Sequence, residues 1–318
     1  MGESSLTATV GVVTYGRPEY VDDLLKSLLE QTVHPTEILV VDDSHADRTR
    51  RTVDAYRHRF ERVGTDLRYL ARVGPDSMPG ARNTVINCSE SDVVCFLDDD
   101  VLCAPAWFET VVGVFERRPD VAAVGGPAIS VDDDLEPVRQ IIRAPKNQNH
   151  IDACGRTVSR GKNWIPPEPV YTQRLEGANM AFRREALADV DGFDRAYDRG
   201  PAKFEEVDTM ARLVRRGDRL MYHPAALVHH FEALEGGSRA AMTHVDLENE
   251  YWFARNYVLF CRKNARIPSW LSITCLILSG LRPWRVLRFV ETALDGDRSQ
   301  FSRIRGYLDG IVFDRSLR

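Results

Sequence analysis

Short apolar runs alternate with amphipathic segments of helical length through the first 125 residues. The runs predict strands at 9–14, 37–41, 67–71, 92–97 and 121–125. Between them, Val21, Leu24, Leu25, Leu28 and Leu29 fall on one helical face behind Pro18, and further helices are predicted before residue 67 and at 81–88 and 105–117. This alternation predicts an α/β fold with a mostly parallel sheet, flanked by helices, of the doubly wound nucleotide-binding kind.

The second half of the chain is less regular. Residues 131–175 are acidic at first and then rich in proline and aromatic side chains, and so long an irregular stretch is usually functional or mobile. Regular structure is predicted again from residue 177, with a helix at 205–216 and one closing strand at 219–230. The remainder, from about residue 246, predicts helices with aromatic faces.

Polar residues stand repeatedly where a predicted strand ends. These positions are Thr14-Tyr15-Gly16-Arg17, Asp42-Asp43 and Asp98-Asp99-Asp100. Ligands of doubly wound sheets bind outside the carboxyl ends of the strands, so these residues are candidates for one binding site. Neither GxGxxG nor GxxxxGK[ST] occurs after the first strand, which argues against a dinucleotide-binding protein and against a P-loop nucleotide-binding protein.

The three aspartates at 98–100 concentrate negative charge at the end of a rigid strand. Two carboxylates about 4 Å apart repel by roughly 4 kcal/mol at an effective dielectric constant near 20, which favours a bound cation. Oxygen ligands suit Mg²⁺ or Mn²⁺, whose coordination a substrate phosphate often completes. An ordinary acidic turn after a strand is the alternative.

The charge of the chain is distributed unevenly. The net charge is −5, yet residues 251–318 hold 12 Lys/Arg against 5 Asp/Glu. Within this tail, residues 269–281 are uncharged and mostly apolar, although 13 residues are too few to span a bilayer. With Trp270, Trp284 and the following arginines, residues 266–318 are a candidate for peripheral contact with anionic membrane, the alternative being a solvated basic helix.

Cysteine spacing and the N-terminus bear on the compartment. The six cysteines form no CxxC pair or metal-finger spacing, which favours reduced thiols. Residues 1–9 lack the basic and apolar regions of a secretory signal. We therefore expect a cytoplasmic protein, peripheral at the cytoplasmic face of the membrane if the tail binds lipid, without a nucleic-acid partner.

Several motifs, in this order, resemble a family 2 glycosyltransferase with the GT-A fold over roughly residues 7–232. They are Thr14-Tyr15-x-Arg17, Val40-Val41-Asp42-Asp43 with Asp47, Gly80-Ala81-Arg82-Asn83, Leu97-Asp98-Asp99-Asp100, Gly177-Ala178-Asn179-Met180, Gly192-Phe193-Asp194, Glu205-Glu206-Val207-Asp208 and His230. The resemblance implies a nucleotide-diphosphate sugar donor, Mn²⁺ or Mg²⁺, and displacement with inversion at the anomeric carbon. It also implies a GT-A catalytic domain at 1–240, with a nucleotide-sugar half at about 7–130 and an acceptor half at 131–240, followed by a basic helical extension at 241–318.

The resemblance assigns the donor and metal residues. Asp100 aligns with the metal-binding carboxylate, Asp98 or Asp99 would meet the ribose or support the metal, and His230 aligns with a histidine that completes the metal shell in some members. On its own, a histidine at a strand end is more often polar surface. The other nucleotide-sugar candidates, with a lean towards uracil, are Thr14, Tyr15, Arg17, Asp42, Asp43 and Arg82. Asp42 and Asp43 could instead cap a turn, Arg17 and Arg82 could be structural ion-pair partners, and Tyr15 could belong to the core.

The resemblance also assigns the base and the sugar site. Inverting transfer needs a group that takes the proton of the acceptor hydroxyl, and Glu206 maps to that position with Glu205 as the second choice. Glutamate here departs from the commoner aspartate, and acidic residues also favour the first turn of any helix. Donor or acceptor sugar contacts map to Glu176, Gly177, Ala178, Asn179 and Asp208, although Gly177 could merely start a strand.

The expected activity is transfer of a sugar from a nucleotide-diphosphate sugar, with a UDP-sugar favoured, to a saccharide or lipid-linked hydroxyl acceptor in glycan, cell-surface polysaccharide or lipid-linked oligosaccharide synthesis. A nucleotidyltransferase is the alternative in chemistry, although residues 14–20 lack the glycine-rich basic loop that it would need. A non-catalytic nucleotide-sugar-binding partner of another enzyme is the alternative in class.

Overall fold

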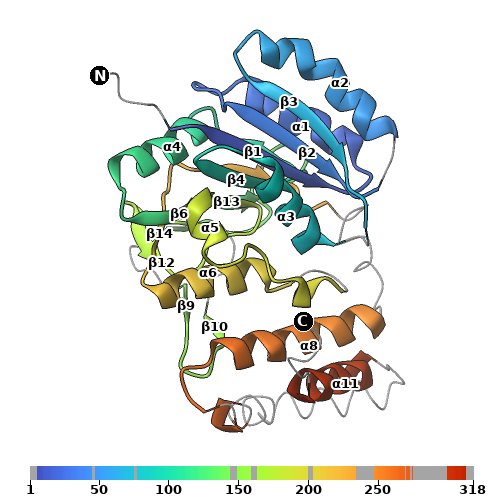
Figure 1. Cartoon of the computed structure of the whole chain (residues 1–318), viewed down its shortest axis with the longest axis vertical. Helices are drawn as coiled ribbons and strands as arrows, with labels where there is room; N and C mark the ends of the chain where they lie inside the picture. Colours follow the sequence, from blue (N-terminus) through green and yellow to red (C-terminus); the bar gives the residue numbers. More distant parts are fainter. Residues whose placement is uncertain are drawn as a thin grey trace.

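The structure is a computed structural model that describes residues 6–44, 47–74, 77–143, 149–158, 163–199, 203–233, 247–268, 270–272, 274 and 299–312. Within these ranges, helices cover both sides of a central sheet, and two further helices lie at the end of the molecule next to α6 (Glu205–Arg216) (Figure 1). This is the α/β architecture that the alternating pattern predicts.

The central sheet is mixed. Its strands are β1 Ala8–Thr14, β2 Glu37–Asp42, β3 Asp66–Ala71, β4 Val93–Asp98, β6 Val121–Gly125, β12 Val170–Thr172, β13 Asn179–Arg183 and β14 Arg219–Tyr222. In the described part of the chain they follow the order β12-β14-β6-β13-β4-β1-β2-β3. β4, β1, β2 and β3 are parallel, whereas β13 runs antiparallel between β4 and β6. The first half of the sheet is therefore the predicted parallel unit.

The helices divide between the two faces of this sheet. α1 (Pro18–Leu29), α2 (Asp47–Glu61) and α4 (Trp107–Arg117) pack on one face in a single apolar cluster. α3 (Met78–Cys88), α5 (Arg184–Ala188) and α6 pack on the other. At Gly11 of β1, a Cβ atom would lie 2.4 Å from a methyl carbon of Val85, so the absence of a side chain lets α3 approach the sheet closely.

The remaining strands are short. They are β5 Val101–Cys103, β7 Ala128–Ser130, β8 Ile142–Arg143, β9 His150–Ile151, β10 Thr157–Val158, β11 Trp164–Ile165 and β15 Val228–His230. β15 lies between β5 and β7 in a second sheet, and β10-β9 and β11-β8 form two small pairs. The stretch predicted as irregular, 131–175, thus contains several short strands among its turns.

The single closing strand predicted at 219–230 is wrong. The structure forms two strands there, β14 in the central sheet and β15 in the second sheet. Between them the chain turns, with the Ala226 amide donating to the His223 carbonyl at 3.1 Å. Pro224 lies in this turn and cannot donate a backbone hydrogen bond to a sheet, which explains the break.

The C-terminal residues that the structure describes form mainly helices, as predicted. A 3-10 turn η1 (Arg195–Tyr197) and α6 share an apolar cluster with α8 (Leu247–Asn264), and α11 (Ser299–Val312) lies beside α8 (Figure 1). Among the described residues, none of the helices combines the length and apolar character needed to cross a bilayer. Most of the apolar segment 269–281 and all of 282–298 lie outside the described residues, so the predicted membrane contact stays a prediction.

Candidate active site

The polar strand ends predicted from the sequence meet at one edge of the sheet. In the parallel register, Thr14 pairs with Asp42 across β1 and β2, and Val13 pairs with Asp98 across β1 and β4. The segments 14–17, 42–43 and 98–100 therefore begin side by side. Neighbouring parallel strands end at the same edge, which is why sequence alone was sufficient to group them.

Asp98, Asp100 and His230 form a cluster suited to a metal ion. One ligand atom from each lies within 4.8 Å of the others, and His230 Nε2 lies 3.1 Å from Asp100 Oδ1. Asp100 and His230 are buried, and Asp98 is partly exposed. Two carboxylates and one imidazole are a chemically suitable donor set for Mn²⁺. The residues present thus fit the metal that the sequence predicts.

The loop after β15 holds Asp100 in place. The Ala233 amide donates to Asp100 Oδ2 at 2.9 Å, and the Phe231 amide donates to the Asp100 carbonyl at 3.0 Å. Arg17 donates from Nη2 to the Ala233 carbonyl at 3.0 Å. Residues more than 100 positions apart thereby fix the Asp100 carboxylate.

Asp99 points to the first loop rather than to the cluster. Thr14 Oγ1 donates to Asp99 Oδ2 at 2.7 Å, and Arg17 Nη1 donates to Asp99 Oδ1 at 3.0 Å. Burial raises the pKa of Asp99 to about 7, with Asp100 acting in the same direction and Arg17 against it. Thr14 and Arg17, predicted to contact the donor, are thus partners of the Asp99–Asp100 turn in this structure.

Asp42 and Asp43, the predicted base or ribose contacts, are buried and hydrogen-bonded within the protein. Asp42 accepts hydrogen bonds from the Ser44 amide at 2.8 Å and from the Tyr69 hydroxyl at 3.0 Å. Asp43 accepts from Arg72 Nη2 at 2.8 Å and from the Ser77 amide at 3.0 Å. Tyr15, next to Thr14 in the chain, is 44% exposed.

Arg82 links the Asp98–Asp100–His230 cluster to the acidic pair at the start of α6. Its Nη1 lies 2.8 Å from Glu205 Oε1, and its Nη2 lies 3.5 Å from Asp98 Oδ1 and 3.2 Å from the Gly177 carbonyl oxygen. The sequence placed Arg82 near the diphosphate but gave no signal for its pairing with Glu205, 123 residues away.

The two glutamates at the start of α6 occupy different environments. Glu205 is 3% exposed and bound to Arg82, whereas Glu206 is partly exposed. A Cβ atom at Gly177 would lie 3.4 Å from Glu206 Cγ and 3.5 Å from Arg82 Nη2, so Gly177 lies close to both of these side chains. Glu206 is therefore the accessible carboxyl group of the pair, next to the predicted sugar site.

Burial raises the pKa of Glu205 to about 8, with the charge of Glu206 acting in the same direction and Arg82 against it. A carboxyl group with a raised pKa in the folded state opposes folding as the pH rises, because the unfolded chain ionises first. The contribution of Glu205 to the free energy of unfolding should therefore fall between about pH 4.5 and pH 8, and Glu205→Gln should remove this contribution of about one to a few kcal/mol, since one pKa unit corresponds to about 1.4 kcal/mol. Urea unfolding of both proteins at pH 5 and pH 8 measures the difference; parallel changes would contradict it.

Asn179 lies in the predicted sugar site by sequence but is buried in the structure. Its side chain accepts from Trp107 Nε1 at 2.9 Å and donates to the Ala226 and Pro127 carbonyls at 2.7 and 3.3 Å. Ala178 is also buried, and the Asn179 amide donates to the Glu176 carbonyl at 2.9 Å. Asn179 thus ties β13 to α4 and to the turn before β15.

Asn179→Ala should lower the free energy of unfolding by roughly 2–4 kcal/mol, because it leaves a buried indole N–H and two carbonyl groups without these partners. Urea denaturation measures the change, and Asn87→Ala, at an exposed position on α3, is the control with the same truncation. Unchanged stability together with a raised donor KM would instead indicate a direct sugar contact.

Asp208, another predicted sugar contact, is fully buried in a polar network. Its carboxylate accepts from the Tyr197 hydroxyl at 3.2 Å, from Arg212 Nε at 2.9 Å and from Lys263 Nζ at 2.8 Å. The structure therefore separates Asp208 from the neighbouring glutamates and connects it to α8. No local signal in the sequence indicated Lys263 as its partner.

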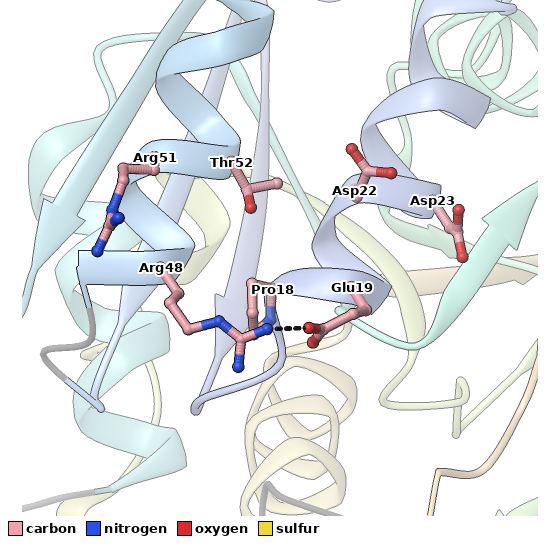
Figure 2. Close-up of a pocket in the computed structure, with 7 residues that line it drawn as sticks. All are labelled: Pro18, Glu19, Asp22, Asp23, Arg48, Arg51 and Thr52. Carbon is pink, nitrogen blue, oxygen red and sulfur yellow. Dashed lines mark hydrogen bonds and ion pairs between the residues drawn. The ribbon is translucent and has the colours of Figure 1, made fainter.

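A surface hollow of about 420 Å³ lies between the first turns of α1 and α2 (Figure 2). Glu19 and Arg48 form an ion pair at its edge, and Asp22, Asp23 and Arg51 also line it. None of the site residues predicted from the sequence belongs to this lining. The candidate active site is therefore the edge of the sheet around Asp98, Asp100, His230 and Glu206.

Known proteins are similar to this chain in sequence or in fold. The chain is 28% identical over 245 residues to pre-mycofactocin glycosyltransferase of Mycobacterium tuberculosis, a match that covers 72% of this chain and 49% of the relative. It is 27% identical over 237 residues to glucosyl-dolichyl phosphate glucuronosyltransferase of Haloferax volcanii, covering 71% and 69%. The chain thus spans about half the length of the first relative.

The fold is also that of a solved structure described as GalNAc-T7 with UDP, GalNAc and Mn²⁺. The TM-score is 0.59 at 16% identity, and the superposition covers 84% of this chain and 52% of the other. The sequence model described as Glycosyl transferase family 2 matches residues 9–190, which is more than half of the chain. The protein therefore belongs to glycosyl transferase family 2.

Proposed function

We propose that the chain transfers a sugar from a nucleotide-diphosphate sugar, preferably a UDP-sugar, to a hydroxyl acceptor with inversion at the anomeric carbon. One observation carries this proposal: Arg82 and Gly177 connect the Asp98–Asp100–His230 cluster to Glu206. Arg82 contacts both Asp98 and the Gly177 carbonyl, and Gly177 lies next to Glu206. A donor that bridges these two groups has its diphosphate at the cluster and its sugar beside Glu206. The solved structure with UDP and Mn²⁺, which shares the fold, supports the donor class.

The reaction forms one bond and breaks one. The acceptor hydroxyl oxygen bonds to the anomeric carbon as the bond from that carbon to the diphosphate oxygen breaks, and the nucleoside diphosphate leaves with the electron pair. Glu206 receives the hydroxyl proton, because it is the accessible carboxyl group beside the sugar position. Asp98, Asp100 and His230 would hold Mn²⁺ or Mg²⁺, which would stabilise the charge of the leaving diphosphate.

Donor-induced thermal stabilisation tests the donor class. A ligand that binds only the folded state raises the melting temperature by mass action. We expect UDP-sugars to raise Tm in the presence of Mn²⁺, GDP- and dTDP-sugars to do so less, and EDTA to abolish the shift. Equal shifts with and without metal, or none with any nucleotide sugar, would contradict the proposal.

For the acceptor, we favour a lipid-linked saccharide at an anionic membrane surface over a soluble one. The support is the excess of basic residues at 251–318 and the similarity to a relative that is named for a dolichyl phosphate substrate.

Sedimentation with vesicles containing anionic or only neutral lipid tests the proposed contact with the membrane. Replacing Arg282, Arg285 and Arg288 by serine should abolish binding to anionic vesicles, whereas the same replacement of the exposed Arg57 and Arg59 on α2 and Arg62 directly after it should not. Equal sedimentation of both variants would contradict the membrane contact.

A further inference from the structure

The residue before the acidic pair has an unusual backbone conformation. Phe204 precedes α6 and has φ 79° and ψ −6°. This is the left-handed region, which glycine adopts readily and bulky residues adopt rarely. Its carbonyl accepts the first helical hydrogen bond, from the Asp208 amide at 2.8 Å. Such a conformation persists only where the surroundings over-determine it, and here it sets the direction in which Glu205 and Glu206 leave the backbone.

The ring of Phe204 is held by α8. Its centroid lies 5.5 Å from that of Phe253, 5.5 Å from that of Tyr257 and 5.7 Å from that of Phe260, and it is stacked on the last at 24°. Phe260 is fully buried, and Phe253 and Tyr257 are partly buried. All three belong to one helix that lies beside α6 (Figure 1). These ring contacts can compensate the unfavourable backbone of Phe204.

A second contact between the same two helices lies one turn further along α6. Lys263 Nζ of α8 binds Asp208 Oδ2 at 2.8 Å and Asp194 Oδ2 at 2.6 Å, and Asn264 Nδ2 lies 3.3 Å from Asp208 Oδ1. The first turn of α6 is thus attached to α8 at Phe204 and at Asp208, on either side of the two glutamates. Both helices lie outside the residues 9–190 that the family model matches.

We propose that α8 is a positioning element for catalysis, which holds the Glu206 carboxylate at the sugar site through Phe204 and Asp208. This inference rests on the proposed role of Glu206 as the base. It assigns to a helix of the C-terminal extension a part in the reaction, without direct contact between α8 and the substrate. The aromatic anchor is a positioning device because a small displacement of a catalytic group reduces the rate of the chemical step more than the binding of the donor.

The test compares two truncations on α8. Phe253→Ala removes one ring from the Phe204 contact, whereas Val258→Ala truncates a side chain that packs against Gly310 of α11. The reaction is release of nucleoside diphosphate, with water as acceptor, from the UDP-sugar that gives the largest thermal shift, measured well below the Tm of each variant. We expect Phe253→Ala and Phe204→Ala to lower kcat by about 10- to 100-fold with donor KM within about twofold of the unmodified protein. Val258→Ala should lower Tm with kcat unchanged.

Two further variants complete the test. Phe204→Tyr keeps the ring and should retain kcat, and Phe204→Gly accepts the left-handed backbone without the ring and should be as slow as Phe204→Ala. Normal kcat in both Phe204→Gly and Phe253→Ala would overturn the positioning role. If Phe204→Gly and Phe253→Ala had normal kcat while Glu206→Gln was inactive, only the positioning role of α8 would be rejected. If Glu206→Gln was also active, the role of Glu206 as the base would be rejected as well.

Discussion

Glu206→Gln should reduce turnover by about 10²- to 10⁴-fold, the usual contribution of a general acid or base, while Mn²⁺-dependent donor binding stays unchanged. Glutamine preserves the size of the side chain beside Gly177 but cannot accept the acceptor proton. Release of nucleoside diphosphate measures turnover, and isothermal titration of the donor in the presence of Mn²⁺ measures binding. A loss confined to turnover would show that the carboxylate acts in the chemical step.

Glu205→Gln is the matched control, because it makes the same change one residue earlier. Glu205 is buried against Arg82, and glutamine can still accept that hydrogen bond, so turnover should fall much less. The opposite ranking, with Glu205→Gln inactive and Glu206→Gln active, would make Glu205 the base.

Asp100→Asn should weaken Mn²⁺-dependent donor binding by at least about 100-fold. Removal of a residue that only hydrogen-bonds a metal ligand already lowers metal affinity by up to about 100-fold, and Asp100 is proposed to be a ligand itself. Asparagine can still accept from the Ala233 amide, so the loop after β15 should keep its place while the cluster loses a negative ligand. Titration of the donor at several Mn²⁺ concentrations measures the change, and turnover should fall with it.

Asp133→Asn removes the same charge from an exposed residue outside the cluster and should leave metal-dependent binding unchanged. Unaltered affinity and unaltered Mn²⁺ dependence in Asp100→Asn would show that the cluster at Asp98, Asp100 and His230 does not hold the metal.

The fold around the site could be predicted from the sequence because its elements follow local rules. Apolar runs of strand length end in Thr14, Asp42 and Asp98, and parallel pairing brings these ends to one edge of the sheet. The helix at 205–216 was predicted with its bounds, since its apolar spacing and acidic first turn are local features. The prediction of a single strand at 219–230 was wrong, because Pro224 interrupts the pattern and the chain forms two strands, β14 and β15.

The orientation of individual side chains at the site could not be predicted in this way. Asp99 and Asp100 are adjacent and both lie near Arg17, yet Asp99 accepts a hydrogen bond from Thr14 whereas Asp100 lies against His230. Asp208 looks like a third acidic site residue in sequence but binds Lys263, 55 positions away. Such pairings depend on tertiary contacts between distant segments, which neither hydrophobic periodicity nor motif spacing encodes.

Product analysis with a panel of nucleotide sugars, with Mn²⁺ and with EDTA, tests the proposed reaction most directly when it compares the unmodified protein with Asp100→Asn and Glu206→Gln. We expect the unmodified protein to release nucleoside diphosphate and free or transferred sugar from a UDP-sugar only with Mn²⁺, and both variants to lose this release. Release of pyrophosphate, or release of nucleoside diphosphate that survives EDTA and both substitutions, would contradict the proposed reaction.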